Sequence, residues 1–327
     1  MTEVIRSFHP RGQRAYRILL PAGLILLVIL IARIGPEKMW ATWIRADKSL
    51  IVGAALLFCL SMMARGIRWS LLLSATPTPL KYGRAFKACA LNAFFSNLTP
   101  ARAGDVLAPL WLGPHGVSPA VGYGVVVVDR LFDIVAVLAL FCAAVWNFWR
   151  IAPAGFAGYR AIFLFTGLIL IAGVLAVVFV LLRLELIIGR LERRPGRILG
   201  RVAGALRTFS QALASFRRGR ILIAAQGVAL SCWLMDLTTF YLIGRSMVPD
   251  LSWSTSSTAG IFATVASIPT FIPGGLGVGA AAYTVVMTAI GYDTELIGSA
   301  AVLMTLLTHG VRAVLAGLLT RLKLGGN

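Results

Sequence analysis

The feature that most constrains this chain is a set of apolar runs long enough to cross a lipid bilayer. An α-helix needs about 20 mostly apolar residues to span the hydrocarbon core. Hydrophobic residues make up 58% of the 327 residues and charged residues only 13%, against about 25% charged residues in soluble domains. A backbone in lipid must satisfy its own hydrogen bonds, so apolar runs of this length fold as helices. We therefore expect an all-α polytopic membrane bundle that forms a single integral membrane domain over residues 1–327.

Two of the apolar stretches are interrupted by proline and glycine, at residues 85–112 and 257–290. Proline removes a backbone donor and glycine permits unusual turns, so a continuous helix is not expected in either stretch. We predict that each forms a broken or re-entrant segment; the alternative is that one or both cross completely, which gives eight or more spans. The six uninterrupted spans are predicted at residues 18–34, 50–73, 121–146, 161–182, 221–243 and 297–319.

The distribution of basic residues predicts the orientation. The chain carries 31 Lys and Arg against 12 Asp and Glu, and ten arginines lie between Arg183 and Arg220. Basic loops stay in the cytoplasm, so both termini are predicted inside and the two broken segments enter from opposite sides, like an inverted repeat. The segment 183–220 is either an amphipathic helix on the anionic inner leaflet or a solvated linker. Nucleic acid is not an expected partner, because no recognition motif accompanies the charge.

Three charged residues in the predicted span 121–146 are the strongest functional signal. A charge near the bilayer centre costs at least about 2.5–3.5 kcal/mol, so Asp129, Arg130 and Asp133 cannot face lipid. Asp129 and Asp133 share a helix face. Arg130 is positioned to pair with Asp133, which leaves Asp129 for a partner on another helix. The trio is either a buried ion pair that holds helices together or the polar lining of a headgroup or ion path.

The first broken segment combines helix-breaking residues with polar side chains. Freed backbone groups at membrane depth are tolerated only inside protein or beside a wet cavity. A half-helix end next to Arg102 suits a phosphate or carboxylate, although a plain loop is the alternative. The candidate residues here are Asn97, Thr99, Pro100, Arg102, Gly104 and Asp105.

The second broken segment is rich in glycine. It lacks the Lys-Ser/Thr ending of a phosphate-binding P-loop, and we interpret it as the tip of a broken helix or a close packing surface. Its candidate residues are Pro273, Gly274, Gly275 and Gly277.

Other isolated charges lie near the ends of apolar runs. Arg65 and Arg68 are interpreted as snorkelling to the membrane surface. His309 and Arg312 share a helix face at i,i+3 and are either interfacial or functional.

No signature of an enzyme, a metal site or a cofactor site is recognised in the sequence. Four cysteines lie far apart in apolar stretches and have no metal-ligand or redox spacing. No nucleophile elbow, zinc-binding motif or dinucleotide fingerprint is present. We therefore expect no catalytic activity, no metal and no cofactor.

Three stretches, in this order, resemble the flippase-like membrane family typified by the transmembrane region of lysylphosphatidylglycerol synthase. They are residues 97–105 (NLTPARAGD), 129–133 (DRLFD) and 273–278 (PGGLGV). The upstream residues 65–69 (RGIRW) and Arg312 also fit this pattern. One departure is that Gly279 and Ala280 follow the glycine-rich turn, where the family usually has a glutamate.

The resemblance implies a bacterial inner-membrane protein that moves a phospholipid, a hopanoid or a lipid-linked sugar between leaflets. Relatives that transfer aminoacyl groups carry an additional soluble catalytic domain, and we expect this chain to be the membrane part alone. Two other hypotheses remain. One is a secondary transporter of a small anion, and the other is a non-transporting scaffold for an enzyme of envelope-lipid or glycan synthesis.

These patterns together predict one shared site. We expect the two broken segments to approach each other near the middle of the membrane. Arg102, Asp129 and Arg130 are then expected to line a polar site for an anionic or zwitterionic headgroup.

Overall fold

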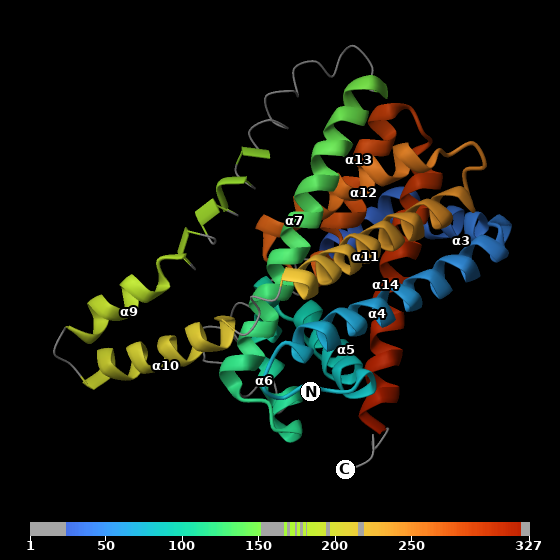
Figure 1. Cartoon of the computed structure of the whole chain (residues 1–327). Coiled ribbons are helices and arrows are strands. Elements are labelled where there is room, and N and C mark those ends of the chain that lie inside the picture. Colours follow the sequence, from blue (N-terminus) through green and yellow to red (C-terminus); the bar gives the residue numbers. More distant parts are fainter. Residues whose placement is uncertain are drawn as a thin grey trace.

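The computed structural model describes residues 24–151, 182–193, 197–214 and 219–321, with short pieces between residues 167 and 180. All regular secondary structure in these ranges is helical (Figure 1), which confirms the all-α prediction. The described helices long and apolar enough to cross a membrane are α4 (Lys48–Ser74), the stretch Pro273–Ile290, α11 (Gly219–Arg245) and α14 (Thr294–Arg321). The protein is a multi-pass membrane protein.

The predicted count of six spans is only partly covered by the described residues. The first run includes the helix Leu24–Ile34, which is followed by α3 (Pro36–Arg45). Residues 18–23 and most of residues 161–182 lie outside the described ranges, so the count stays a prediction. The run at 121–146 is part of α7 (Pro119–Ile151), a helix of 33 residues.

The described residues contain two halves with the same order of elements. In the first half, α4 is followed by α5 (Tyr82–Leu98), the irregular turns η1 (Pro100–Leu107), the short α6 (Ala108–Leu112) and η2 (Gly113–His115), and then α7. In the second half, α11 is followed by α12 (Trp253–Ser267), η4 (Ile268–Thr270), η5 (Pro273–Gly275), α13 (Val278–Ile290) and α14. Both predicted broken segments are therefore broken in the structure.

The two halves point in opposite directions. In Figure 1, α7 and α14 run antiparallel, and α5 and α6 lie at the opposite end of the bundle from α12 and α13. Both breaks also contain a non-glycine residue in the left-handed region two positions after a proline: Arg102 (φ 56°) and Phe271 (φ 53°). These features are those of an inverted repeat, while the membrane sides from which the two segments enter stay a prediction from the loop charges.

Local sequence signals determine where several helices begin and end. The side chain of Asp47 accepts hydrogen bonds from the backbone of Ser49 and Leu50 and thereby caps α4. Ser252 caps α12 in the same way. The helix α13 ends at Ile290 and is capped by Gly291, whose φ of 110° is accessible at low cost only to glycine.

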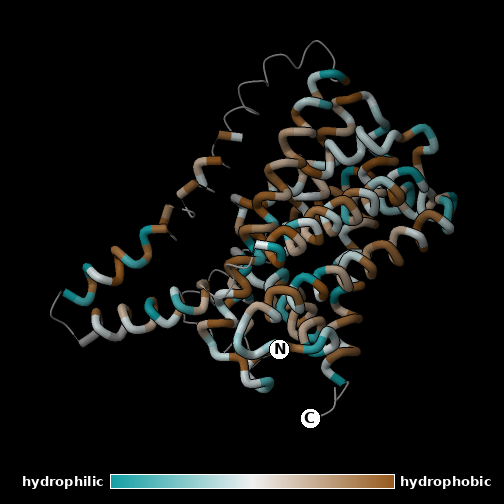
Figure 2. The backbone as a smooth tube through the Cα atoms, viewed as in Figure 1, coloured by the Kyte–Doolittle hydropathy of each residue, from teal (hydrophilic) through white to brown (hydrophobic). Residues whose placement is uncertain are grey.

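The distribution of polarity is inverted relative to that of a soluble protein. Large apolar side chains are exposed on the outside, including Leu56 at 66% and Val285 at 67%, whereas Arg68 and Asp129 are each 1% exposed. Figure 2 shows hydrophobic residues along the helices that form the outside of the bundle. A surface of this kind suits lipid and leaves the charged groups to the interior.

The basic segment between the two halves contains α9 (Leu184–Glu192) and α10 (Arg197–Ala214). The two helices pack on each other, and α10 also contacts α7. An Arg207–Glu192 ion pair of 2.8 Å links them, and the pair extends from one side of the bundle (Figure 1). The described part of the predicted amphipathic helix is therefore helical, while contact with the inner leaflet stays a prediction.

Candidate functional site

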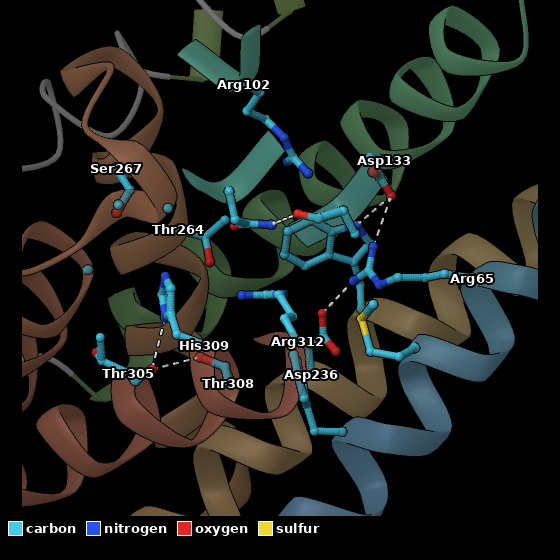
Figure 3. Close-up of a pocket in the computed structure, with 18 of the residues that line it drawn as sticks. Arg65, Arg102, Asp133, Asp236, Thr264, Ser267, Thr305, Thr308, His309 and Arg312 are labelled. Atoms are coloured by element: carbon cyan, nitrogen blue, oxygen red, sulfur yellow. Dashed lines mark hydrogen bonds and ion pairs between the residues drawn. The ribbon is translucent and has the colours of Figure 1, made fainter. Parts of the chain in front are cut away.

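A cavity of about 460 Å³ lies between the two breaks and is lined by both halves of the chain. Arg102 reaches it from η1, Asp129 and Arg130 from α7, Gly274 from η5, and Arg312 from α14. Figure 3 shows Arg102 and Arg312 directed into the same space from different elements. The two breaks therefore contact each other, and Arg102, Asp129 and Arg130 line one cavity, while its use as a headgroup site stays a prediction.

Arg68 is the buried centre of an ion network that joins α4 to α7. Its Nη2 lies 2.6 Å from Asp129 Oδ1 and its Nη1 lies 2.8 Å from Asp133 Oδ1. The side chain is 1% exposed. The interpretation of Arg68 as a snorkelling residue is therefore wrong, because two carboxylates of α7 hold the guanidinium inside the bundle.

Arg130 neutralises the same two carboxylates from the other side. Its Nη2 lies 2.8 Å from Asp129 Oδ2 and its Nη1 lies 3.0 Å from Asp133 Oδ2. The predicted i,i+3 pairing with Asp133 is confirmed, and Asp129 has the predicted partner on another helix, which is Arg68. Because the two arginines share both carboxylates, the trio on α7 both holds helices together and lines the cavity.

A second ion pair joins α4 to α11. Arg65 Nη2 lies 2.5 Å from Asp236 Oδ2, and the Ser61 hydroxyl donates to Asp236 Oδ1 over 2.6 Å. The Arg65 guanidinium also lies over the ring of Trp233, 5.9 Å from its centroid. The Arg65 side chain is only 14% exposed, so the snorkelling interpretation is wrong for this residue as well.

Two arginines in the cavity differ from the rest, because neither has a carboxylate partner in the described part of the chain. Arg102 is exposed to the cavity and is held in a left-handed conformation that is costly for a residue with a side chain. Arg312 lies over the ring of Phe58, 5.0 Å from its centroid.

Five arginines and three aspartates line the cavity, so with His309 neutral the lining has a net charge of +2.

The first break is held against α5 by its own polar residues. The amide of Gly104 donates to Thr99 Oγ1 over 2.6 Å. Asp105 Oδ1 accepts from Asn92 Nδ2 over 2.8 Å and from the Ser96 hydroxyl over 2.5 Å. A Cβ atom on Gly104 would lie only 2.5 Å from the backbone of α5. These contacts show that much of the predicted binding chemistry is used to fold the break.

The predicted residues of the first break therefore divide into two groups. Asn97, Thr99 and Arg102 line the cavity. Pro100 and Gly104 do not line it, and Asp105 reaches it only through a 3.5 Å ion pair with Arg130 Nε.

The glycines of the second break allow close approach between three elements. Gly274 has a φ of 61°, and a Cβ atom there would lie 2.4 Å from His309 Nε2 and 3.1 Å from the carbonyl oxygen of Asn97. Gly275 also lines the cavity, whereas Pro273 is buried beside it and Gly277 precedes α13. Both interpretations of this segment, a broken helix and a close packing surface, describe it correctly.

Some residues that line the cavity were only weakly indicated as functional by the sequence. Asp236 is a single acid in an apolar run, and His309 and Arg312 share one face of α14. Gly279 and Ala280 also line the cavity, so no carboxylate lies at the place where the resembled family usually has a glutamate. Across the described ranges, no group of three or more His, Cys, Asp or Glu side chains is arranged to hold a metal ion.

The fold and the site define a class: a multi-pass helical membrane protein whose two oppositely oriented broken helices enclose a charged cavity. Residues 15–316 match the family described as "Lysylphosphatidylglycerol synthase TM region". The chain belongs to this family, as the three sequence stretches predicted.

Three relatives are similar over most of the chain. A UPF0104 membrane protein of Pyrococcus horikoshii is 20% identical, with 92% of this chain and 95% of the relative covered. A UPF0104 membrane protein of Methanothermobacter thermautotrophicus is 24% identical over 80% of this chain and 81% of its own length. Glycosyltransferase AglD of Haloferax volcanii is 26% identical over 94% of this chain, which spans only 54% of that relative.

Proposed function

We propose that this protein moves a lipid with an anionic phosphate-containing headgroup between the two leaflets of its membrane. The observation that carries the proposal is the pair Arg102 and Arg312, which reach one cavity from opposite halves without a carboxylate partner in the described chain. Arginine is well suited to phosphate, because its planar fork donates two parallel hydrogen bonds. Each of the other cavity arginines has a carboxylate partner in the surrounding ion network.

The net charge of the cavity narrows the class of cargo. A lining of net charge +2 favours a phospholipid or a lipid-linked sugar phosphate over a hopanoid, which has no phosphate to pair with Arg102 or Arg312. The wall also includes large apolar side chains that remain exposed, Ile268 at 55% and Phe271 at 56%. Such a surface accommodates acyl chains, whereas a small soluble anion has no apolar part that would contact it.

The family resemblance and the loop charges suggest the setting of this function. In this proposal the protein lies in a bacterial inner membrane, as the resemblance implies. Both termini lie in the cytoplasm and the segment from Arg183 to Arg220 contacts anionic lipids of the inner leaflet, as the loop charges indicate. The chain acts as a transporter and not as an enzyme. An enzyme of envelope-lipid or glycan synthesis is the proposed partner, and the similarity to a relative named as a glycosyltransferase supports this pairing.

The test is leaflet exchange of labelled lipids in proteoliposomes. Arg102→Gln and Arg312→Gln should each slow exchange of an anionic phospholipid at least about tenfold, because each removes a charge-assisted hydrogen bond. Arg45→Gln is the matched control, since Arg45 is an exposed arginine at the end of α3. Wild-type rates in both cavity variants would contradict the proposal. Uptake of inorganic phosphate without lipid exchange would favour the anion transporter.

A further inference from the structure

We propose that Nε2 of His309 accepts a hydrogen bond from the transported headgroup and thereby selects phosphodiester lipids that carry a hydroxyl or amine donor. The inference rests on the proposed function, and it assigns a specificity role to one residue of the cavity. His309 lies on α14 three residues before Arg312, so the two side chains share a helix face.

The hydrogen-bonding pattern of the imidazole determines which nitrogen is free. His309 Nδ1 lies 2.9 Å from the carbonyl oxygen of Thr305. A carbonyl oxygen only accepts, so Nδ1 carries the proton in this contact. In the neutral ring Nε2 is therefore an acceptor with a lone pair.

No neighbouring protein group satisfies this acceptor. Nε2 is buried and has no hydrogen-bond partner among the described residues. A hydroxyl has one proton, and each nearby cavity hydroxyl uses its proton on a carbonyl of its own helix. The donor and acceptor residues are Thr99 and Phe95, Thr264 and Gly260, Ser267 and Ala263, Thr305 and Ala301, and Thr308 and Met304. A buried acceptor without a hydrogen-bond partner costs free energy. A hydrogen-bond donor of the ligand would remove this cost.

Gly274 packs directly against the imidazole and leaves room for it at the edge of the cavity. A Cβ atom at this position would lie 2.4 Å from Nε2, so any other residue would press on the imidazole. Figure 3 shows His309 and Arg312 side by side at the cavity. His309 lies about one helical turn from Arg312 on α14. When a phosphate pairs with Arg312, the adjacent atoms of its headgroup are therefore within reach of His309.

The experiment compares two lipids that differ only in the donor. Phosphatidylglycerol and phosphatidylmethanol with the same acyl chains are both monoanionic phosphodiesters, but only the glycerol headgroup carries hydroxyls. Their binding is measured by native mass spectrometry of the full chain released from phosphatidylcholine nanodiscs. The wild type should bind phosphatidylglycerol roughly tenfold more tightly, which corresponds to about 1.4 kcal/mol.

Three variants test whether His309 causes the preference for phosphatidylglycerol. His309→Phe should bind both lipids equally, whereas His309→Gln keeps a side-chain acceptor and should keep the preference. Arg312→Gln should weaken binding of both lipids without removing the preference. Equal wild-type affinities for the two lipids, or a preference that persists in His309→Phe, would overturn the inference.

Two further readouts separate this inference from the proposed function. A binding preference without any leaflet exchange would refute translocation and support the role of His309. Displacement of phosphatidylglycerol by equimolar glycerol 3-phosphate would overturn the assignment of the site to lipids. Thermal unfolding of each variant checks that it is folded.

Discussion

Replacing Arg68 with methionine tests the buried ion network most directly. The substitution keeps a long apolar side chain and removes the guanidinium that lies 2.6 Å from Asp129 and 2.8 Å from Asp133. Arg130 then remains as the only cation within 3.0 Å of the two carboxylates in the described structure. Arg130 then serves two acids, and the next cation is the more distant Arg65, whose Nη1 lies 3.9 Å from Asp133 Oδ1, so the two negative charges are less well compensated.

The expected cost follows from the burial of the groups. Breaking a fully buried ion pair costs about 3–5 kcal/mol, because the remaining charge stays away from water. Arg68 and Asp129 have side chains that are each 1% exposed, so solvent cannot replace the lost partner. Arg130 still contacts both acids and offsets part of this loss, so we expect Arg68→Met to lower the free energy of unfolding by about 3 kcal/mol.

Reversible unfolding in mixed detergent micelles measures this difference. The double variant Arg68→Met with Asp129→Asn restores the balance of charge and should be more stable than Arg68→Met alone. The matched control is Lys38→Met, which removes the exposed Lys38–Glu295 ion pair and should leave stability nearly unchanged. A loss below about 1 kcal/mol for Arg68→Met, which is the range of solvated pairs, would refute the reasoning, because it would mean that water reaches the network.

Three further predictions concern packing, orientation and pH. Gly104→Ala should destabilise the protein by about 1–3 kcal/mol, because its Cβ would lie 2.5 Å from the backbone of α5; Gly53→Ala, where a Cβ meets nothing within 4 Å, should not, and thermal unfolding in detergent compares the two. In a cysteine-free background, Gly200→Cys on α10 should react with an impermeant thiol reagent in inside-out vesicles, and labelling in intact cells would invert the topology. Hydrogen bonds from the side chain and backbone of Ser49 lower the pKa of Asp47 below its usual value, so its stabilising effect is present above about pH 4 and is lost as the pH falls; Asp47→Ala should be less stable than the wild type at pH 7, and a difference that does not shrink towards pH 3 would contradict this.

The cost of placing charge in lipid explains which features could be predicted from the sequence. The trio on α7 had to face the interior, and the proline- and glycine-rich stretches had to be broken. Arg130 and Asp133 are three residues apart in one helix, so their pairing follows from helical geometry alone. Each of these predictions concerns residues of a single segment, so none of them required knowledge of how the helices pack.

Features that depend on helix packing could not be predicted in the same way. Arg68 and Asp129 lie 61 positions apart in sequence, and nothing in either segment indicates that α4 and α7 meet there. An arginine near the end of an apolar run is compatible with snorkelling as well as with a buried ion pair. Similarly, Asp105 was predicted to bind a ligand, but it accepts hydrogen bonds from α5. A single sequence does not distinguish a polar group used for folding from one left for a ligand.

The ion network has a mechanical consequence for any cycle of transport. Buried charge pairs link α4 to α7 through Arg68 and α4 to α11 through Arg65. Sliding these helices past one another would separate several buried charges at once, at a cost of several kcal/mol for each pair. The three helices therefore act as a stationary frame. In the proposed transport cycle we therefore expect the rearrangements that expose the cavity to each side of the membrane to involve α5, α6, α12 and α13, and not sliding among α4, α7 and α11.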